Sequence, residues 1–217
     1  MPDFELENAV RQRAHNPNLL VAGLDEAGVG ALAGPIVAAA VVLGKERDWF
    51  AELRDSKKLS PRQRYRLRGL IVDNAAALGI EEASNDEIDE VGVTHARRYA
   101  VLRAFWACEK SLGGASLAVV CDDSRLDCLS AELGGEPSIF RDKADEESYS
   151  VAAASIVAKV ERDEFMRFKS LEYQQYKFAD NKGYGTRAHL EALERFGPCP
   201  LHRRSFAPVK NAGKERG

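Results

Sequence analysis

Cysteine is scarce in this chain, and the spacing of the cysteines does not indicate a disulfide framework. The four thiols are Cys108, Cys121, Cys128 and Cys199. Two disulfides could form in principle, but a chain without an export signal is expected to keep its cysteines reduced. Neither Cys121 with Cys128 nor Cys199 with His202 has a convincing zinc spacing, and no second pair completes a site. We therefore expect structural cysteines.

Long apolar runs and an excess of positive charge are also missing. No run is long and clean enough to cross a bilayer, and residues 1–13 are charged and lack the apolar centre of a signal peptide. We therefore expect a cytoplasmic protein without membrane contact. The net charge of −3 argues against a general nucleic-acid coating protein, which is usually basic. It is compatible with an enzyme that concentrates acid at a metal site.

Hydrophobic periodicity and turn residues predict a mixture of strands and helices. Residues 36–43 form an apolar run that indicates a buried strand, although its three consecutive alanines are compatible with a helix. We expect strands over residues 18–24, 34–43, 79–83, 117–121 and 138–140, and helices over 60–77, 85–113, 150–168 and 186–196. This order predicts a central sheet covered by helices, with a helical C-terminal part. The final residues, 211–217, are expected to fray.

Helix starts are marked by capping residues. Ser60 and Gln63 have the spacing of a reciprocal cap. Ser84 or Asn85 is expected to cap the next helix, and Thr186 the last one.

Acidic residues follow two of the predicted strands. Asp25 and Glu26 come directly after an apolar strand, Asp122 ends another, and Asp145 precedes the alanine-rich helix. Buried carboxylates are unfavourable unless solvent, a metal or cations compensate them. Four converging carboxylates would suit divalent ions that hold the attacking and leaving oxygens of phosphoryl transfer. Because neighbouring strand residues point to opposite faces, we expect the strand to end at Asp25 so that the following turn brings Glu26 round.

Each acidic group also has a simpler interpretation. Asp145 would suit the first turn of a helix through the helix dipole. Asp122 and Asp123 could be turn residues, and Asp25 with Glu26 could lie in a solvated turn. Spacing alone supports a metal site only weakly and leaves these alternatives open.

The glycine turn overlaps a dinucleotide-binding motif. Gly28, Gly30 and Ala33 satisfy the G-x-G-x-x-G/A fingerprint. A pyrophosphate there would be repelled by Asp25 and Glu26, and the segment that follows is more typical of a strand than of a helix. We therefore disfavour a nucleotide-cofactor enzyme.

Several longer motifs occur in a fixed order along the chain. They are GLDEAGVGALAGPIVAAAVVL at 23–43, DSKKL at 55–59, KAD with SVAAASIVAK and RD between 143 and 163, GYGT with a histidine at 183–189, and GP with HRRSF at 197–206. Together they resemble the type 2 ribonucleases H, the bacterial ribonuclease HII family in particular, over residues 20–209. The resemblance implies an α/β fold, a ribonuclease H-like mixed β-sheet flanked by helices, with a helical C-terminal region.

The resemblance also implies organisation and activity. A catalytic core is expected over residues 1–168 and a helical substrate-binding region over 169–217, packed as one compact unit. The implied enzyme is a metal-dependent endonuclease that cleaves the RNA strand of RNA–DNA hybrids. It also cleaves 5′ of ribonucleotides embedded in duplex DNA, leaves 5′-phosphate and 3′-hydroxyl ends, and serves ribonucleotide removal in DNA repair and replication. A monomer is expected.

The resemblance assigns catalytic metal ligands by position. These are Asp25, Glu26, Asp122 and Asp145, which would hold Mg²⁺ or Mn²⁺ in a two-metal site.

It assigns substrate-binding residues in the same way. The backbone of Gly28, Val29 and Gly30 would grip the ribonucleotide and sense its 2′-hydroxyl, the group that distinguishes RNA from DNA. Tyr184 would stack on the deoxyribose after the RNA–DNA junction; its alternative is an exposed loop aromatic. Arg203 is either a phosphate contact or, like most long cationic side chains, solvated surface.

Three positions depart from the family pattern. Val29 replaces a usual arginine, and the lost charge-assisted hydrogen bond is worth about 1.5–3 kcal/mol, so we expect a weaker preference for a single embedded ribonucleotide over a long hybrid. Asp123 replaces a common glycine, and it would either raise the pKa of Asp122 by repulsion or point away. Gly92 replaces a frequent asparagine, and we expect it to interrupt the long helix.

Overall fold

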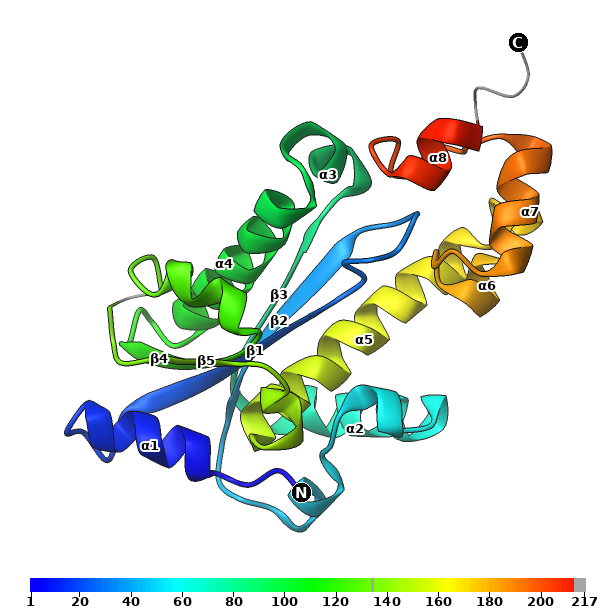
Figure 1. The fold of residues 1–217 in the computed structure, drawn as a ribbon. Coiled ribbons are helices and arrows are strands. Elements are labelled where there is room, and N and C mark those ends of the chain that lie inside the picture. The colour runs from blue at the N-terminus through cyan, green and yellow to red at the C-terminus, as the bar shows by residue number, and fades with distance from the viewer. Residues whose placement is uncertain (134, 213–217) are drawn as a thin grey trace.

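A five-stranded mixed sheet forms the centre of the molecule (Figure 1). The structure is a computed structural model that describes residues 1–133 and 135–212. The strands are β1 (Leu20–Ala27), β2 (Ile36–Leu43), β3 (Ala75–Ala83), β4 (Leu117–Asp122) and β5 (Ile139–Arg141), in the spatial order β3-β2-β1-β4-β5. β1, β2 and β3 pair antiparallel, whereas β4 pairs parallel with β1, and β5 parallel with β4.

Helices cover both faces of this sheet. They are α1 (Glu5–Arg13), α2 (Pro61–Asn74), α3 (Asn85–Val91), α4 (Val93–Ser111), α5 (Tyr149–Lys169), α6 (Phe178–Asn181), α7 (Arg187–Phe196) and α8 (Ala207–Ala212). α4 lies on one face, α5 and α2 lie on the other, and α6 to α8 gather near one end of α5 (Figure 1). This arrangement confirms the predicted α/β fold with a helical C-terminal region. Within the described ranges, no helix has the length and apolar character needed to span a membrane.

Alternation along the strands divides the core into two layers. Leu24 and Val42 pack in the cluster with the buried face of α4, whereas Val41 packs in the cluster with α2 and α5. A side chain at Gly23 would overlap the backbone of α5 at Ser150, so this glycine lets α5 lie directly on β1. The close approach fixes where the N-terminal end of α5 meets the sheet.

The five predicted strands and four predicted helices are present with shifted boundaries, and the structure adds α1, α6 and α8. The helix predicted to end at Ala77 ends at Asn74, and Ala75 already begins β3. β3 pairs with β2 along its whole length, from Ala75 opposite Leu43 to Ala83 opposite Ile36. Pairing with β2 along its whole length therefore makes residues 75–78 part of a strand. The local sequence does not predict this.

Predicted helix starts and interruptions agree with the structure. Ser60 and Gln63 form the reciprocal cap, and Ser84 rather than Asn85 caps α3. Thr186 caps α7. Gly92, at φ +81°, separates α3 from α4, as its departure from the family pattern predicted. Of the residues expected to fray, 211 and 212 end α8 and the others lie outside the described residues.

Candidate active site

Three of the predicted carboxylates converge at one edge of the sheet. Asp25 and Asp122 lie on β1 and β4, which are parallel neighbours whose C-terminal ends lie side by side. Asp145 comes from the short 3-10 helix Ala144–Glu146, which precedes α5. One carboxylate oxygen from each residue lies within 4.8 Å of the other two. We call Asp25, Asp122 and Asp145 the carboxylate cluster.

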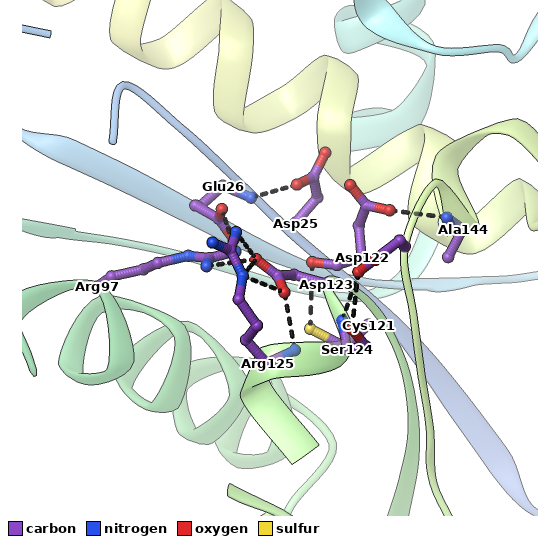
Figure 2. A network of polar contacts seen from close by, with 10 residues as sticks. Asp25, Glu26, Arg97, Cys121, Asp122, Asp123, Ser124, Arg125 and Ala144 are labelled. Atoms are coloured by element: carbon purple, nitrogen blue, oxygen red, sulfur yellow. Dashed lines mark hydrogen bonds and ion pairs between the residues drawn. The ribbon is translucent and has the colours of Figure 1, made fainter. Parts of the chain in front are cut away.

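Glu26 points away from this cluster. The expectation that the strand ends at Asp25 is wrong, because β1 continues to Ala27 and Glu26 stays paired opposite Ala38 of β2. Alternation therefore directs Glu26 toward α4, where its Oε1 lies 2.6 Å from Nη2 of Arg97 (Figure 2). Burial raises the pKa of Glu26 to about 7 although Arg97 opposes the shift. Its role as a metal ligand stays a prediction.

Burial and mutual repulsion set the electrostatics of the cluster. Asp25 is 8% exposed and Asp145 is 4% exposed. Burial raises the pKa of Asp25 well above its ordinary value, and the charges of Glu26 and Asp122 add to the shift. Burial, followed by repulsion from Asp122, raises the pKa of Asp145 to about 7. These acids are thus unfavourable as three adjacent anions, and a cation would relieve them.

Asp122 is anchored by the segment that carries Asp145. The backbone N–H of Ala144 donates to Oδ1 of Asp122 at 2.7 Å (Figure 2). Burial raises the pKa of Asp122, and this hydrogen bond opposes the shift. Oxygen donors of this kind suit Mg²⁺ or Mn²⁺. The residues present therefore fit a divalent metal site, and a solvated turn or a simple helix-dipole role does not describe their burial and convergence.

The loop at residues 55–59 lies beside the carboxylate cluster, a role that the sequence did not reveal. Burial acts to lower the pKa of Lys57, but the acids around it, first Asp55 and then Asp145 and Asp25, raise it. Ser56 Oγ and Ser155 Oγ are 3.0 Å apart, which ties the loop to α5. Lys57 thus supplies a positive charge next to the cluster. The sequence motif at residues 55–59 identified the loop, but only the tertiary structure shows which charged groups surround Lys57.

Asp123 faces away from the cluster. Its Oδ2 accepts a hydrogen bond from Nη1 of Arg97 at 2.6 Å, and its Oδ1 accepts from the backbone N–H of Arg125 at 2.8 Å (Figure 2). Hydrogen bonding from Arg125 lowers the pKa of Asp123. Burial, not Asp123, is the main cause of the raised pKa of Asp122. Asp123 is therefore a turn residue that also joins two arginines, and its φ of +117° is one that favours glycine.

A buried arginine shapes the glycine loop. Arg203 is fully buried, so neither prediction for it, phosphate contact or solvated surface, is correct. Its guanidinium donates to the carbonyl oxygens of Gly28 at 2.8 Å, Val29 at 2.7 Å and Gly34 at 2.8 Å. Each of these hydrogen bonds holds one backbone carbonyl in place. The peptide N–H groups between these carbonyls are therefore held in position as well. The predicted substrate loop is therefore braced from the C-terminal region.

A second buried arginine braces the same loop from α5. Arg162 donates to the carbonyl oxygens of Pro35 at 3.0 Å and Ala33 at 3.2 Å. A side chain at Gly28 would overlap Arg162, and its φ is +95°, so both space and backbone conformation require glycine there.

Tyr184 lies beside the braced loop. Its neighbour Gly183 accepts a hydrogen bond from the N–H of Leu32 at 2.8 Å. Tyr184 is 38% exposed as a residue, and the guanidinium carbon of Arg162 lies 5.3 Å from the centroid of its ring. One ring surface thus contacts a cation while part of the side chain remains accessible. Its stacking role stays a prediction.

The fold and the cluster define a class of enzyme. A mixed sheet of this order, with buried carboxylates at the ends of its parallel pair, is the arrangement of the ribonuclease H-like nucleases, which are hydrolases. A family model described as Ribonuclease HII matches residues 22–209. Ribonuclease HII of Lactobacillus johnsonii is 44% identical over 195 residues, which cover 90% of this chain and 74% of the relative. The chain belongs to the ribonuclease HII family, whose members cleave the RNA of RNA–DNA hybrids.

Solved structures agree with this assignment. The ribonuclease H2 of Pyrococcus horikoshii matches with a TM-score of 0.72 at 27% identity, covering 91% of this chain and 98% of that one. Bst-RNase HIII in complex with Mn²⁺ matches with a TM-score of 0.73 at 23% identity, covering 94% of this chain and 73% of that one. The second likeness shows the fold alone. The family predicted from the sequence motifs is confirmed.

Proposed function

We propose that this protein is a metal-dependent endoribonuclease with two kinds of substrate. It cuts the RNA strand of RNA–DNA hybrids, and it cuts 5′ of ribonucleotides embedded in duplex DNA, leaving 5′-phosphate and 3′-hydroxyl ends. The observation that supports this proposal is the convergence of Asp25, Asp122 and Asp145, three mostly buried carboxylates with raised pKa values. Such a cluster is costly to build without a cation to neutralise it.

The carboxylates and Lys57 would have separate roles in this reaction. Asp25, Asp122 and Asp145 would hold Mg²⁺ or Mn²⁺, with Glu26 as the fourth ligand that the family resemblance assigns. When bound, the metal supplies an activated water and stabilises the charge that develops on the scissile phosphate. Lys57 would moderate the negative charge of the site, since it already lies among these acids.

Substrate selection would fall to the braced glycine loop. The backbone of Gly28, Val29 and Gly30 would contact the ribonucleotide, because backbone amides can donate to a 2′-hydroxyl that DNA lacks. Tyr184 would stack on the following deoxyribose. Ribonucleotide removal in DNA repair and replication, the cytoplasmic location, the monomeric state and the choice between the two metals stay predictions from the sequence.

A cleavage assay with a point-mutant control tests the proposal. A labelled DNA duplex that carries one ribonucleotide is incubated with Mg²⁺ or Mn²⁺, and the wild type is compared with Asp25→Asn. Asp73→Asn is the matched control, because Asp73 is an exposed carboxylate on α2. We expect a cut 5′ of the ribonucleotide with wild type and control and none with Asp25→Asn.

The same assay distinguishes a second candidate, a relative that binds such duplexes without cutting them. Val29 and Asp123 are the departures that favour this candidate. Binding by the wild type with no cleavage under either metal would support it and contradict the proposed activity. Cleavage that persists in Asp25→Asn would contradict the assigned role of the carboxylate cluster.

A further inference from the structure

Three arginines share a surface pocket with Val29. Arg97 and Arg98 from α4 and Arg125 from the 3-10 helix Ser124–Leu129 line a surface pocket of about 220 Å³ together with it. The remaining lining residues are Val93, Thr94 and Leu126. We call these seven residues the arginine pocket. It opens beside the position at which the family usually carries an arginine and this chain carries valine.

The arginines outnumber the carboxylates that pair with them. Arg97 uses Nη2 for Glu26 and Nη1 for Asp123, so its charge is fully compensated. Arg125 pairs with the same Asp123, while 82% of its side chain remains exposed (Figure 2). The charge of Asp142 also acts on Arg125, yet most of the Arg125 side chain stays accessible to an incoming anion.

Two of the pocket's arginines have hydrogen-bond donors without a partner among the described residues. The Nε atoms of Arg97 and Arg98 are buried and have no hydrogen-bond partner among the described residues. An unpaired buried donor is unfavourable, and pairing it with an anion is favourable. The planar guanidinium group is also well suited to phosphate oxygens. The exposed guanidinium of Arg125, in the same pocket as Arg98, therefore matches a phosphate group better than a neutral ligand.

We propose that the arginine pocket binds a backbone phosphate of the nucleic-acid substrate next to the glycine loop. Arg98 and Arg125 contact the phosphate, while Arg97 stays paired with Glu26 and Asp123. The pocket thereby supplies the cationic contact that Val29 lacks. This inference rests on the proposed function, because it takes residues 28–30 as the loop that holds the ribonucleotide.

Asp123 lies where its negative charge affects how strongly the arginine pocket binds a phosphate. Its carboxylate is held by Arg97 and Arg125 in a backbone conformation, φ +117°, that favours glycine. Asp123 competes with an incoming phosphate for Arg125. Removing its charge is therefore expected to strengthen binding, whereas removing an arginine weakens it.

Equilibrium binding without cleavage tests the pocket. Binding of a fluorescein-labelled RNA–DNA hybrid is measured by anisotropy in EDTA at several salt concentrations. We expect Arg98→Gln and Arg125→Gln each to weaken binding by about tenfold, as for a lost charge-assisted hydrogen bond. Each should also make the negative slope of log affinity against log salt shallower by about 1, as for one lost phosphate contact. Lys110→Gln, at the far end of α4, is the charge-matched control and should leave the slope unchanged.

Two further variants act in the opposite direction. Asp123→Asn is expected to tighten binding severalfold. Val29→Arg is expected to restore most of the affinity lost in Arg98→Gln, with a smaller gain in the wild type, because the pocket already carries that contact there. Thermal melting of each variant verifies that the fold is retained, and Arg125→Gln changes a side chain that is largely exposed.

The outcomes separate this inference from the proposed function. Wild-type binding and cleavage with unchanged salt slopes in both arginine variants would show that the arginines only stabilise the fold, and would overturn the pocket alone. A wild type that neither binds nor cleaves hybrid and single-ribonucleotide duplexes would overturn the proposed function and the pocket with it.

Discussion

Replacing Asp145 by asparagine removes one anion from the carboxylate cluster, and we expect it to stabilise the metal-free protein. The folded protein raises the pKa of Asp145 from 3.8 to about 7. A shift of roughly three units corresponds to at most about 4 kcal/mol of stability lost when the group is charged. Because Asp122 and Asp55 share the repulsion and relax when it is relieved, we expect about 1–3 kcal/mol to be regained. For a chain of this size that is an increase of roughly 3–10 °C in melting temperature.

The sign of the effect depends on pH. A carboxyl group whose pKa is higher in the folded state binds its proton more tightly there, so it favours folding at low pH. This contribution is complete below the unfolded value, near 4, and is lost as the pH rises through the folded value, about 7. The advantage of Asp145→Asn should therefore be largest at pH 8 and absent at pH 4.

Thermal melts in EDTA and in Mg²⁺ measure both effects. In EDTA at pH 8 the asparagine variant should melt above the wild type, whereas Mg²⁺ should reverse the order because only the wild type gains stability from metal binding. Glu146→Gln is the neighbouring control: Glu146 is exposed, Lys58 lowers its pKa, and its loss should give no stabilisation. An Asp145→Asn variant that melts below the wild type in EDTA at pH 8 would refute the reasoning.

Three other substitutions test the packing that supports the site. Arg203→Met leaves several buried carbonyl groups without a donor and should cost about 3 kcal/mol or more in urea denaturation; an unchanged midpoint would contradict the bracing role. Gly23→Ala should push α5 off β1 and destabilise the fold by about 1–3 kcal/mol or more, whereas Gly69→Ala on α2, where a Cβ meets nothing within 4 Å, should stabilise it slightly; equal melting temperatures would contradict this. Gly92→Ala should cost about 1 kcal/mol, because its φ of +81° disfavours a side chain, and a stabilised variant would count against the strained break between α3 and α4.

Sequence patterns predicted the parts of the site that depend on local order. Asp25 and Asp122 each follow an apolar run in the sequence, and this local signal predicts acids near the ends of strands. Asp145 is different, because its first-turn setting is equally typical of a simple helix start. Only the packing of α5 on β1, which Gly23 permits, brings Asp145 to the other two acids.

Other features depended on contacts between distant segments. The orientation of Glu26 is decided by its pairing with Ala38 of β2, which keeps β1 extended for two more residues. Arg203 has the sequence of a surface cation, yet it is fully buried because loop carbonyls far away in the chain accept its hydrogen bonds. Lys57 lies in a motif whose place beside the acids no local pattern specifies. Charge alone does not reveal whether a long side chain meets water, a carboxylate or a backbone carbonyl.

The two buried arginines separate sugar recognition from bond cleavage in the proposed reaction. Arg162 and Arg203 hold the glycine loop in one shape before any substrate arrives, so binding costs little additional ordering of the backbone. The acids that would hold metal lie at positions 25, 122 and 145, whereas part of the bracing comes from position 203, near the chain end. A defect near residue 203 would therefore leave the metal ligands in place and blunt the distinction between ribose and deoxyribose. The fidelity of such an enzyme would then be lost before its ability to cut.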